Sequence, residues 1–521
     1  MKNLLPGLLL GLSLSSTAFA QDYDLSWGTA AEVGSPTASY APIGMYKGSY
    51  YSLQFSKGDG ILIEVDKNND VVGQKPLITS EKKFESELTF KRGDKIVIIN
   101  SDFDSKTKTI SIFASTYSFA GKLLTPKPKL LTTIKVERNN ENNDIIYKLS
   151  ADSSKLAIIE DHNMSDKDDA KFSVAVITTD DLKEMWNNSF TAPYTDKDFG
   201  LLSFAVDNNG NMLLLSVISG GEGKRLEKYS TRMLTIVAGS KSYEDKELKI
   251  EGKYISSGFI SYANDGKLLI TGFYNDLTSK GKDEGIEGAF MCITEIKDLG
   301  SPDLKMRKID PSTKAAITPT GGWAKAFGAD ELNTYFIKDI KVRPDGSGYV
   351  IAEQRYVTIN YGDNLQTRVY NFNHLIVYNF DTNQDITYIS TIPKYQSTTA
   401  SVPYFLGISI WTGSMTRFCF KYNSFEAIEK DGTIYIMYND HRDNGDARTM
   451  KEAKGMTNKN KANGVIVAVD ANGKWEKEAL FVGKDIDVIL ETSSSYLIPG
   501  EGFIISAERK KDVQYGKVLI K

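Results

Sequence analysis

The sequence predicts an all-β protein, built as a single β-propeller of eight four-stranded blades whose ring is closed by an N-terminal strand. Three observations predict this fold. A strand–turn–strand pattern recurs along the chain, helical periodicity is almost absent, and the last repeat lacks a strand that the N-terminal region can supply. Seven blades is the alternative, because the first two repeats are faint.

The repeat consists of a strand, a tight polar turn and a strongly apolar strand. Segment 340–356, IKVRPDGSGYVIAEQRY, shows the pattern, with Asp and Gly in the turn and β-branched or aromatic residues in the strands. A second hairpin often follows, as in 464–480, so each unit has four strands, named A to D in chain order. The B strands are expected to begin near Tyr50, Lys95, Lys155, Asn211, Lys267, Gly348, Thr433 and Gly502.

The two ends of the chain are expected to complete one blade together. The last unit, from residue 496 to residue 521, contains only three strands. The stretch YDLSWGTAAEV at 23–33 belongs to no repeat and has the composition of a strand. We therefore expect 23–33 to be strand D of the last blade, which removes an open sheet edge.

The first twenty residues have the pattern of a secretory signal peptide. Lys2 is followed by an apolar run from Leu4 to Leu14 that is too short to span a bilayer, and then by Ala18-Phe19-Ala20. We expect cleavage after Ala20, which leaves 21–521 as the propeller. The expected location is the periplasm or the exterior of a Gram-negative cell. A membrane anchor is the alternative, but no second long apolar run follows.

Charge and cysteine content exclude some classes of partner and cofactor. The full chain has 63 Lys and Arg against 67 Asp and Glu, a balance that does not favour nucleic acid as a partner. Cys292 and Cys419 fall in strand-like segments, so buried thiols are expected, with one disulfide as the alternative. Two cysteines and three scattered histidines do not suggest a zinc site, and no cofactor is expected.

The turns resemble those of exported bacterial propellers with TolB and WD40-like repeats. Pro344-Asp345-Gly346 and Asp265-Gly266 match the turn motif of these repeats. The resemblance implies the fold and does not imply an activity. The sialidase signature S-x-D-x-G-x-T-W is missing from every unit, which counts against the glycosidase branch of propellers.

The long segments between strands are expected to lie on one face. In a four-stranded blade the A–B and C–D turns share one face, while the B–C loops and D-to-A connections share the other, called here the B–C face. Loops of this length are usually functional or disordered, so we expect the B–C face to bind a partner. The five long segments are 275–287, 311–336, 357–368, 394–423 and 439–463.

Two of these segments contain aromatic side chains that would serve as interface anchors. The alternative is that these segments fold back on the propeller or add strands. The segment 439–463 contains His441 and Arg442 near its start and has mixed charges, so a solvated surface loop is expected, with partner contact as the alternative. The aromatic candidates are Trp323, Phe327, Tyr404, Phe405 and Trp411.

Polar residues recur where several B strands end. Arg355, Arg442 and Arg509 lie on three successive blades and could together bind a carboxylate or sulfate. Pairing of these charges with neighbouring side chains is the favoured interpretation. The recurring stretches are Glu160-Asp161-His162, Tyr274-Asn275-Asp276, Glu353-Gln354-Arg355, Asn439-Asp440-His441-Arg442 and Glu508-Arg509.

Motifs for chemistry are weak. No Ser-His-Asp order, H-E-x-x-H motif or phosphate-binding glycine loop is apparent. Asp66-Asn68-Asp70 and Asp381-Asn383-Asp385 resemble fragments of calcium loops, but they lack the bidentate glutamate and fall in expected C–D turns, so turns are favoured.

Together these patterns favour a non-catalytic exported propeller that binds a protein or glycan of the cell envelope through its B–C face. A structural plug or scaffold of an envelope or secretion machine is one alternative. A glycan hydrolase or lyase with its site at the channel mouth is another.

Overall fold

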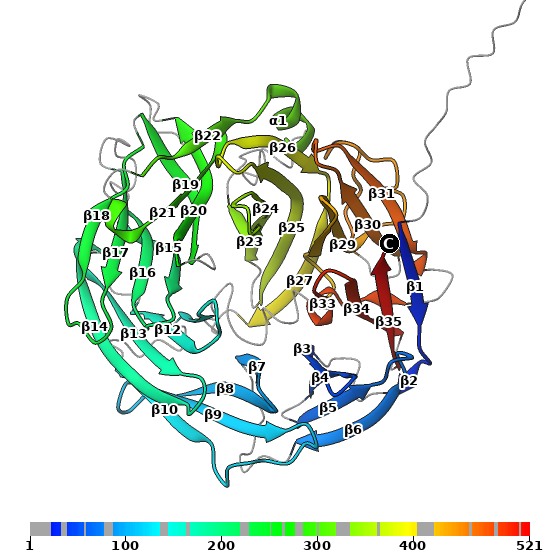
Figure 1. The fold of residues 1–521 in the computed structure, drawn as a ribbon, viewed down its shortest axis with the longest axis horizontal. Helices are drawn as coiled ribbons and strands as arrows, with labels where there is room; N and C mark the ends of the chain where they lie inside the picture. Colours follow the sequence, from blue (N-terminus) through cyan, green and yellow to red (C-terminus); the bar gives the residue numbers. More distant parts are fainter. Residues whose placement is uncertain are drawn as a thin grey trace, which may run out of the picture.

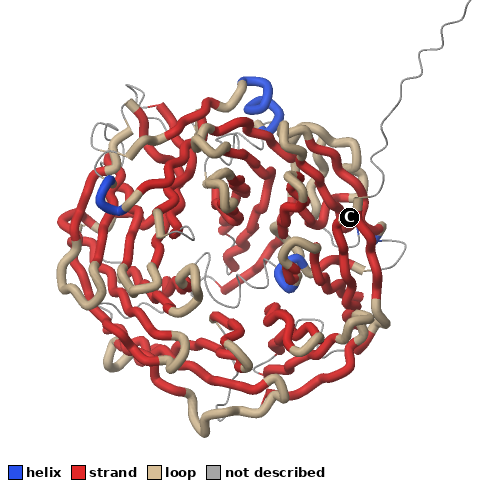
Figure 2. Tube along the Cα trace, in the orientation of Figure 1, coloured by secondary structure: helices blue, strands red, loops and turns tan. Residues whose placement is uncertain are grey.

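The strands form eight antiparallel sheets arranged as blades around a central axis (Figure 1). Figure 2 shows that strands dominate the fold and that helix is confined to short segments. The computed structural model describes residues 22–32, 39–56, 59–77, 87–135, 144–162, 167–218, 229–250, 252–262, 266–276, 285–299, 302–318, 334–361, 365–403, 421–457, 461–483, 488–509 and 512–521.

Blades one to four each contain four strands, given from the inner to the outer edge of the sheet. Blade one has β3 (Ser39–Tyr46), β4 (Ser49–Ser56), β5 (Asp59–Val65) and β6 (Val71–Leu77). Blade two has β7 (Leu88–Arg92), β8 (Lys95–Asp104), β9 (Thr109–Ser118) and β10 (Lys129–Lys135). Blade three has β11 (Asp144–Leu149), β12 (Lys155–Asp161), β13 (Asp169–Thr178) and β14 (Lys183–Thr195). Blade four has β15 (Phe199–Val206), β16 (Met212–Ile218), β17 (Ser230–Ile236) and β18 (Glu244–Glu247).

Blades five to eight carry the additions to this plan. Blade five has β19 (Lys253–Tyr262), β20 (Leu268–Asp276), β21 (Gly288–Thr294) and β22 (Lys305–Lys308), with the short helix η2 (Ile296–Asp298). Blade six has β23 (Tyr335–Val342), β24 (Gly348–Tyr361), β25 (Leu365–Phe380), β26 (Ile386–Ile392) and an extra strand, β27 (Gln396–Pro403). Blade seven has β28 (Glu426–Lys430), β29 (Thr433–His441), β30 (Ala462–Val469) and β31 (Trp475–Phe481). Blade eight has β32 (Ile489–Leu490), η4 (Thr492–Ser494), β33 (Tyr496–Ile498), β34 (Gly502–Arg509) and β35 (Asp512–Ile520).

The eight-blade count is confirmed, and the seven-blade alternative is wrong. Each of the eight B strands begins within one residue of the position expected from the turn pattern. The faint first two repeats form complete blades like the others.

The N-terminal strand closes the ring, as the sequence predicts. β1 (Tyr23–Trp27) and β2 (Ala31–Glu32) both pair antiparallel with β35, with Tyr23 opposite Ile520. Figure 1 shows β1 beside β35, close to the C-terminus. The Tyr23 side chain is 3% exposed, and its hydroxyl donates to the carbonyl of Ala479 on blade seven. Blade eight therefore presents a complete face to blade seven.

The core lies between blades, because each sheet is apolar on both faces. In β12 the side chains from Leu156 to Ile159 are all buried, and they alternate between the clusters shared with blades two and four. Burial of one such aliphatic side chain contributes about 1.5–3 kcal/mol. A blade whose neighbour is missing loses this contribution along an entire face.

The two suspected calcium fragments are turns, as favoured from the sequence. In the turn between β5 and β6, the Asp66 carboxylate accepts the backbone N–H groups of Asn68 at 2.8 Å and Asp70 at 2.9 Å. The Asp381 carboxylate does the same between β25 and β26. Because Asp caps its own turn in this way, the recurrence of Asp and Asn is explained by turn geometry.

Cys292 is a buried free thiol, as expected, and burial raises its pKa to about 11. Cys419 and the proposed signal peptide, residues 1–20, lie outside the described residues. No helix in the described part of the chain is both long and apolar enough to cross a membrane.

Closure of the ring by β1 can be tested with two substitutions on this strand. Tyr23→Ala should lower the free energy of unfolding by about 3 kcal/mol, because it removes a buried aromatic ring between two blades. Asp24→Ala is the matched control, since Asp24 is exposed and pairs with Lys521 only at the surface. Urea denaturation of both variants measures the difference, and equal midpoints would contradict the proposed contribution of β1.

Candidate functional site

Three of the long segments on the B–C face contact one another and form a single surface. The backbone N–H of Met450 donates to the carbonyl of Ala316 at 2.8 Å, and that of Met456 donates to the carbonyl of Tyr395 at 2.8 Å. Ile317, at the end of α1 (Pro311–Ile317), and Met450 are buried in one apolar cluster. This surface is called the insertion platform and comprises residues 311–318, 394–403, 421–425 and 439–457.

Blade six extends far beyond the others on this face. β24 and β25 continue to pair past Arg355 as far as Tyr361, and β27 adds to the outer side of this extension. The six residues of strand past Arg355 reach about 20 Å. In Figure 1, β25 and β27 project over the middle of the ring.

The expectation of a loop at 357–368 is wrong. Most of this segment is strand, because its β-branched and aromatic residues continue the hairpin. The alternative that 394–423 adds a strand is confirmed for β27.

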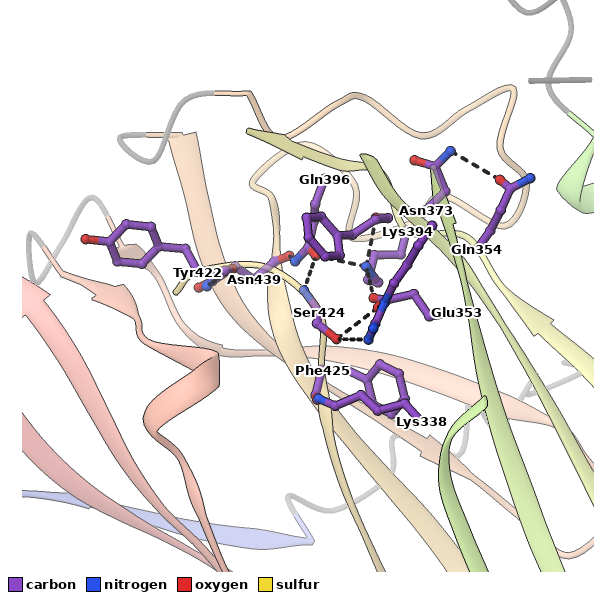
Figure 3. A network of polar contacts seen from close by, with 12 residues as sticks. Lys338, Glu353, Gln354, Asn373, Lys394, Gln396, Tyr422, Ser424, Phe425 and Asn439 are labelled. Atoms are coloured by element: carbon purple, nitrogen blue, oxygen red, sulfur yellow. Dashed lines mark hydrogen bonds and ion pairs between the residues drawn. The ribbon is translucent and has the colours of Figure 1, made fainter. Parts of the chain in front are cut away.

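A buried ion pair lies under the extension (Figure 3). The Lys394 ammonium is 2.8 Å from the Glu353 carboxylate, and both side chains are fully buried. Lys394 also donates to the carbonyl of Phe372 at 2.8 Å. The same carboxylate accepts from the Arg355 guanidinium at 2.6 Å and from the Ser424 hydroxyl at 2.9 Å. Blade six and the start of blade seven therefore share one charged centre.

Opposite charge decides the ionisation of Glu353. Burial by itself would raise the pKa of Glu353, but Lys394 and Arg355 outweigh burial and hold this pKa at about 2. Burial of His374, and to a smaller extent the nearby charge of Lys394, lower the pKa of His374 to about 3. His374 is therefore neutral at physiological pH and accepts or donates one hydrogen bond with Tyr335.

Amides carry the network from blade six to blade eight, and Figure 3 shows its part from Glu353 to Asn439. The Gln396 side chain accepts from Lys394 at 2.8 Å and donates to the carbonyl of Asn439 at 2.7 Å. The Asn439 side chain donates to the carbonyls of Tyr422 at 2.8 Å and Leu490 at 2.7 Å. Gln396 and Asn439 are fully buried, so the network fixes the position of three blades on this face.

The expectation that 439–463 is a solvated loop is wrong for its first part. The Asp440 carboxylate forms a buried ion pair with Lys477 at 2.8 Å and accepts from the Asn444 amide at 2.7 Å. Every third side chain from His441 to Met450 is buried, namely His441, Asn444, Ala447 and Met450. The sequence suggested a loop because charged residues are seldom buried unless they are paired, and these partners are distant in the chain.

A third buried cation joins blade seven to blade eight. Lys421 lies 3.0 Å from Glu491 and 2.6 Å from Glu508, and Tyr422 donates to Glu508. Burial raises the pKa of Glu491 to about 7; Lys421 opposes this shift and Glu508 adds to it. Two carboxylates thus share one ammonium. These ion pairs fix the position of the segment that leads into β28.

The site residues expected from the sequence do not form one site: some are buried, one is exposed, and others lie outside the described residues. Arg355 belongs to the buried network, and its side chain is only 12% exposed. Arg442 is 45% exposed beside Asp443, and His441 is a buried residue of the platform. Trp323, Phe327, Tyr404, Phe405, Trp411 and the side chain of Arg509 lie outside the described residues.

The polar ends of the B strands pair with neighbours, which is the interpretation favoured from the sequence. On blade three, the Glu160 carboxylate at 3.0 Å and the Ser173 hydroxyl at 2.7 Å both contact Nε2 of His162. A Ser-His-Asp type triad places its carboxylate and hydroxyl on opposite ring nitrogens, so this arrangement is not such a triad. Among the described residues, no group of three or more His, Cys, Asp or Glu is placed to hold a metal ion.

The network depends on residues that the sequence did not single out: Lys394, Gln396, Lys421 and Lys477. No local pattern marks these residues, because nothing in their neighbourhood indicates burial. Only the polar B-strand ends gave a signal, and Glu353, Asn439, Asp440 and Glu508 are indeed among the buried members.

Comparisons with known proteins identify no family for this chain and find similarity only at the level of the fold. No protein-family model matches the chain, and no curated protein matches it significantly. Solved structures similar to the chain include Porphyromonas gingivalis dipeptidyl peptidase 4, with 11% identity over 90% of this chain and 58% of that one, at a TM-score of 0.40. The structure of the polysaccharide lyase Uly1 has 9% identity over 87% of this chain and 94% of that one, at a TM-score of 0.34.

Two further similar structures differ in how much of their length the chain covers. The β-propeller domain of the trilobed protease from Pyrococcus furiosus has 9% identity over 87% of this chain and 98% of that one, at a TM-score of 0.34. The chain spans only 53% of the length of a matching prolyl endopeptidase. TM-scores this low say nothing about what the chain binds or catalyses.

The buried pair under the extension can be tested by removing one or both charges. Lys394→Met should lower the free energy of unfolding by about 3 kcal/mol, because it leaves the Glu353 carboxylate buried with less compensation. Lys394→Met combined with Glu353→Gln should cost less than the single change. Lys297→Met, at an exposed pair with Glu295, is the control and should have no measurable effect. Additive losses in urea denaturation would contradict the coupling.

The buried carboxyl of blade three predicts a specific pH dependence. Burial, and to a smaller extent Asp161, raise the pKa of Glu160 to about 8 from its usual 4.5. Between these values the folded protein holds a proton that the unfolded chain has lost, so the stability from this group is present below about pH 4.5 and is lost as pH rises toward 8. Glu160→Gln removes this contribution. The stability of wild type relative to Glu160→Gln should therefore fall between pH 5 and pH 8, and a constant difference would contradict the prediction.

Proposed function

We propose that the protein is an exported, non-catalytic β-propeller that binds a protein of the cell envelope through the insertion platform. The observation that carries this proposal is the set of buried ion pairs that holds the platform in place. Burying charge is unfavourable unless it is compensated, and in some proteins such networks select one conformation; we infer the same role here. A surface fixed before binding loses less conformational entropy when a partner docks.

The exposed side of the platform has a composition suited to a protein partner. Basic and acidic side chains are interspersed there and are close to balanced in number. Such a surface favours pairing with complementary charges on a folded protein. These pairs attract the partner and also fix its position on the surface. The exposed charged residues are Arg442, Asp443, Asp446, Arg448, Lys451, Glu452 and Lys454.

A non-catalytic role is supported by the state of the polar strand ends. Arg355, the arginine at the B-strand end of blade six, pairs with Glu353. Its guanidinium also donates to the Ser424 hydroxyl. These groups support the backbone of the platform. Export is supported by the signal-like pattern of residues 1–20, with the periplasm or cell exterior as the proposed location.

Charge reversal on the platform tests the proposal. The variant Arg442→Glu, Lys451→Glu, Lys454→Glu changes exposed side chains only and should leave the fold intact. Affinity capture with the tagged protein from the envelope fraction of its source organism should recover a stoichiometric protein with wild type, and at least about tenfold less with this variant.

The control carries the same charge change on the opposite face. Lys95→Glu, Lys183→Glu, Lys297→Glu alters exposed residues at A–B and C–D connections and should capture the partner as wild type does. Equal capture by the two triple variants would reject the platform as the binding surface. Absence of any protein partner would favour a glycan instead.

A further inference from the structure

A cavity of about 570 Å³ lies in the central channel, and one of its lining rings, that of Phe336, is 5.5 Å from the Arg355 guanidinium of the buried network. Its walls are formed by the inner strands of four consecutive blades, β11, β15, β19 and β23. The walls are largely apolar, with Ile146, Leu202, Phe204, Phe259, Phe336 and Ile337 among the lining side chains. The volume is within the range typical of sites for small organic ligands.

Two of the lining side chains are unusually exposed for their type. Ile146 and Phe336 are each 44% exposed, although both are large and apolar. Scattered apolar residues on a convex surface need no explanation, but apolar side chains facing one concave space mark a place where a ligand displaces water.

One cation is aimed into this apolar space. The Lys148 ammonium donates to the carbonyls of Phe204 at 2.7 Å and Ile260 at 3.0 Å, and it lies 4.2 Å from the centre of the Phe259 ring. An ammonium has three donors, and the third has no acceptor among the described residues. No described carboxylate lies within ion-pair distance of Lys148.

This arrangement is unlike that of the other largely buried lysines. Lys394, Lys421 and Lys477 each contact at least one carboxylate. Lys148 has only neutral partners, and burial lowers its pKa to about 8. A partly desolvated cation without a counter-charge is unfavourable, and an anion brought by a ligand would relieve this cost.

We propose that the channel cavity binds an organic acid with an apolar body and a single anionic head. The body packs against the side chains of Ile146, Phe259 and Phe336, and the carboxylate or sulfonate accepts the third N–H of Lys148. This inference goes beyond the proposed function, since it concerns the channel and does not depend on the platform.

The competing explanation is that Lys148 only caps backbone carbonyls at the inner sheet edges. Both explanations predict lower stability when Lys148 is replaced. They differ in ligand binding, because a purely structural lysine does not distinguish an anionic ligand from a neutral ligand of the same shape.

A matched pair of fluorescent probes separates the two explanations. Anilinonaphthalene sulfonate and phenylnaphthylamine share their two ring systems, and only the first carries an anion. Lys148→Gln should weaken binding of the sulfonate by about tenfold and binding of the neutral amine by less than about twofold. Ile146→Ser should weaken both probes, which locates them in the cavity. Lys297→Gln, far from the channel, should change neither.

Unchanged sulfonate affinity in folded Lys148→Gln, or equal loss of both probes, would overturn the proposal. Wild-type protein provides a test that does not depend on the variant folding. Decanoate should displace the bound neutral probe at a concentration about tenfold lower than decanol does. Equal displacement by the acid and the alcohol, or no saturable binding of either probe, would also overturn it.

Discussion

The structure depends on one constraint: each four-stranded blade is apolar on both faces and must be covered on both. A single blade cannot satisfy this requirement, and neither can an open row of blades, because the two end faces would remain in water. The ring satisfies it, and β1 makes the ring complete by pairing with β35 across the two ends of the chain. The packing of blade seven against blade eight thus depends on residues separated by almost the whole length of the sequence.

The B–C face uses a second kind of interaction. Between the blades the contacts are apolar and have no preferred direction, but beneath the insertion platform they are charged and directional. Glu353 with Lys394, Asp440 with Lys477, and Lys421 with its two glutamates each join segments that are separate in the chain. Buried charges of this kind tolerate few alternative arrangements, because a displaced partner leaves an uncompensated ion. The platform is therefore held in one conformation although it projects beyond the compact ring.

In the channel, the charge of Lys148 lacks this compensation. The inner strands present sheet edges toward the axis, and Lys148 satisfies two edge carbonyls from blades four and five. Its charge nevertheless has no counter-ion among the described residues. The platform and the channel thus differ in one respect: the buried charges beneath the platform are paired within the protein, whereas Lys148 in the channel has only neutral partners among the described residues.

The sequence by itself determined the blade count, the B-strand starts, the turns and the closing strand. These features follow from short-range patterns: the alternation of apolar strands with Asp, Asn and Gly turns, and the surplus strand at 23–33. It also indicated that polar residues gather at the B-strand ends. Only the tertiary structure decided that Asp440 and Asn444 are buried, that 357–368 continues a hairpin, and which lysines are compensated. Burial of a charge depends on where its partner lies, and the partner of Asp440 is Lys477, beyond any local window. Local pattern fixes the repeating unit, whereas the distant pairings fix what its surface presents.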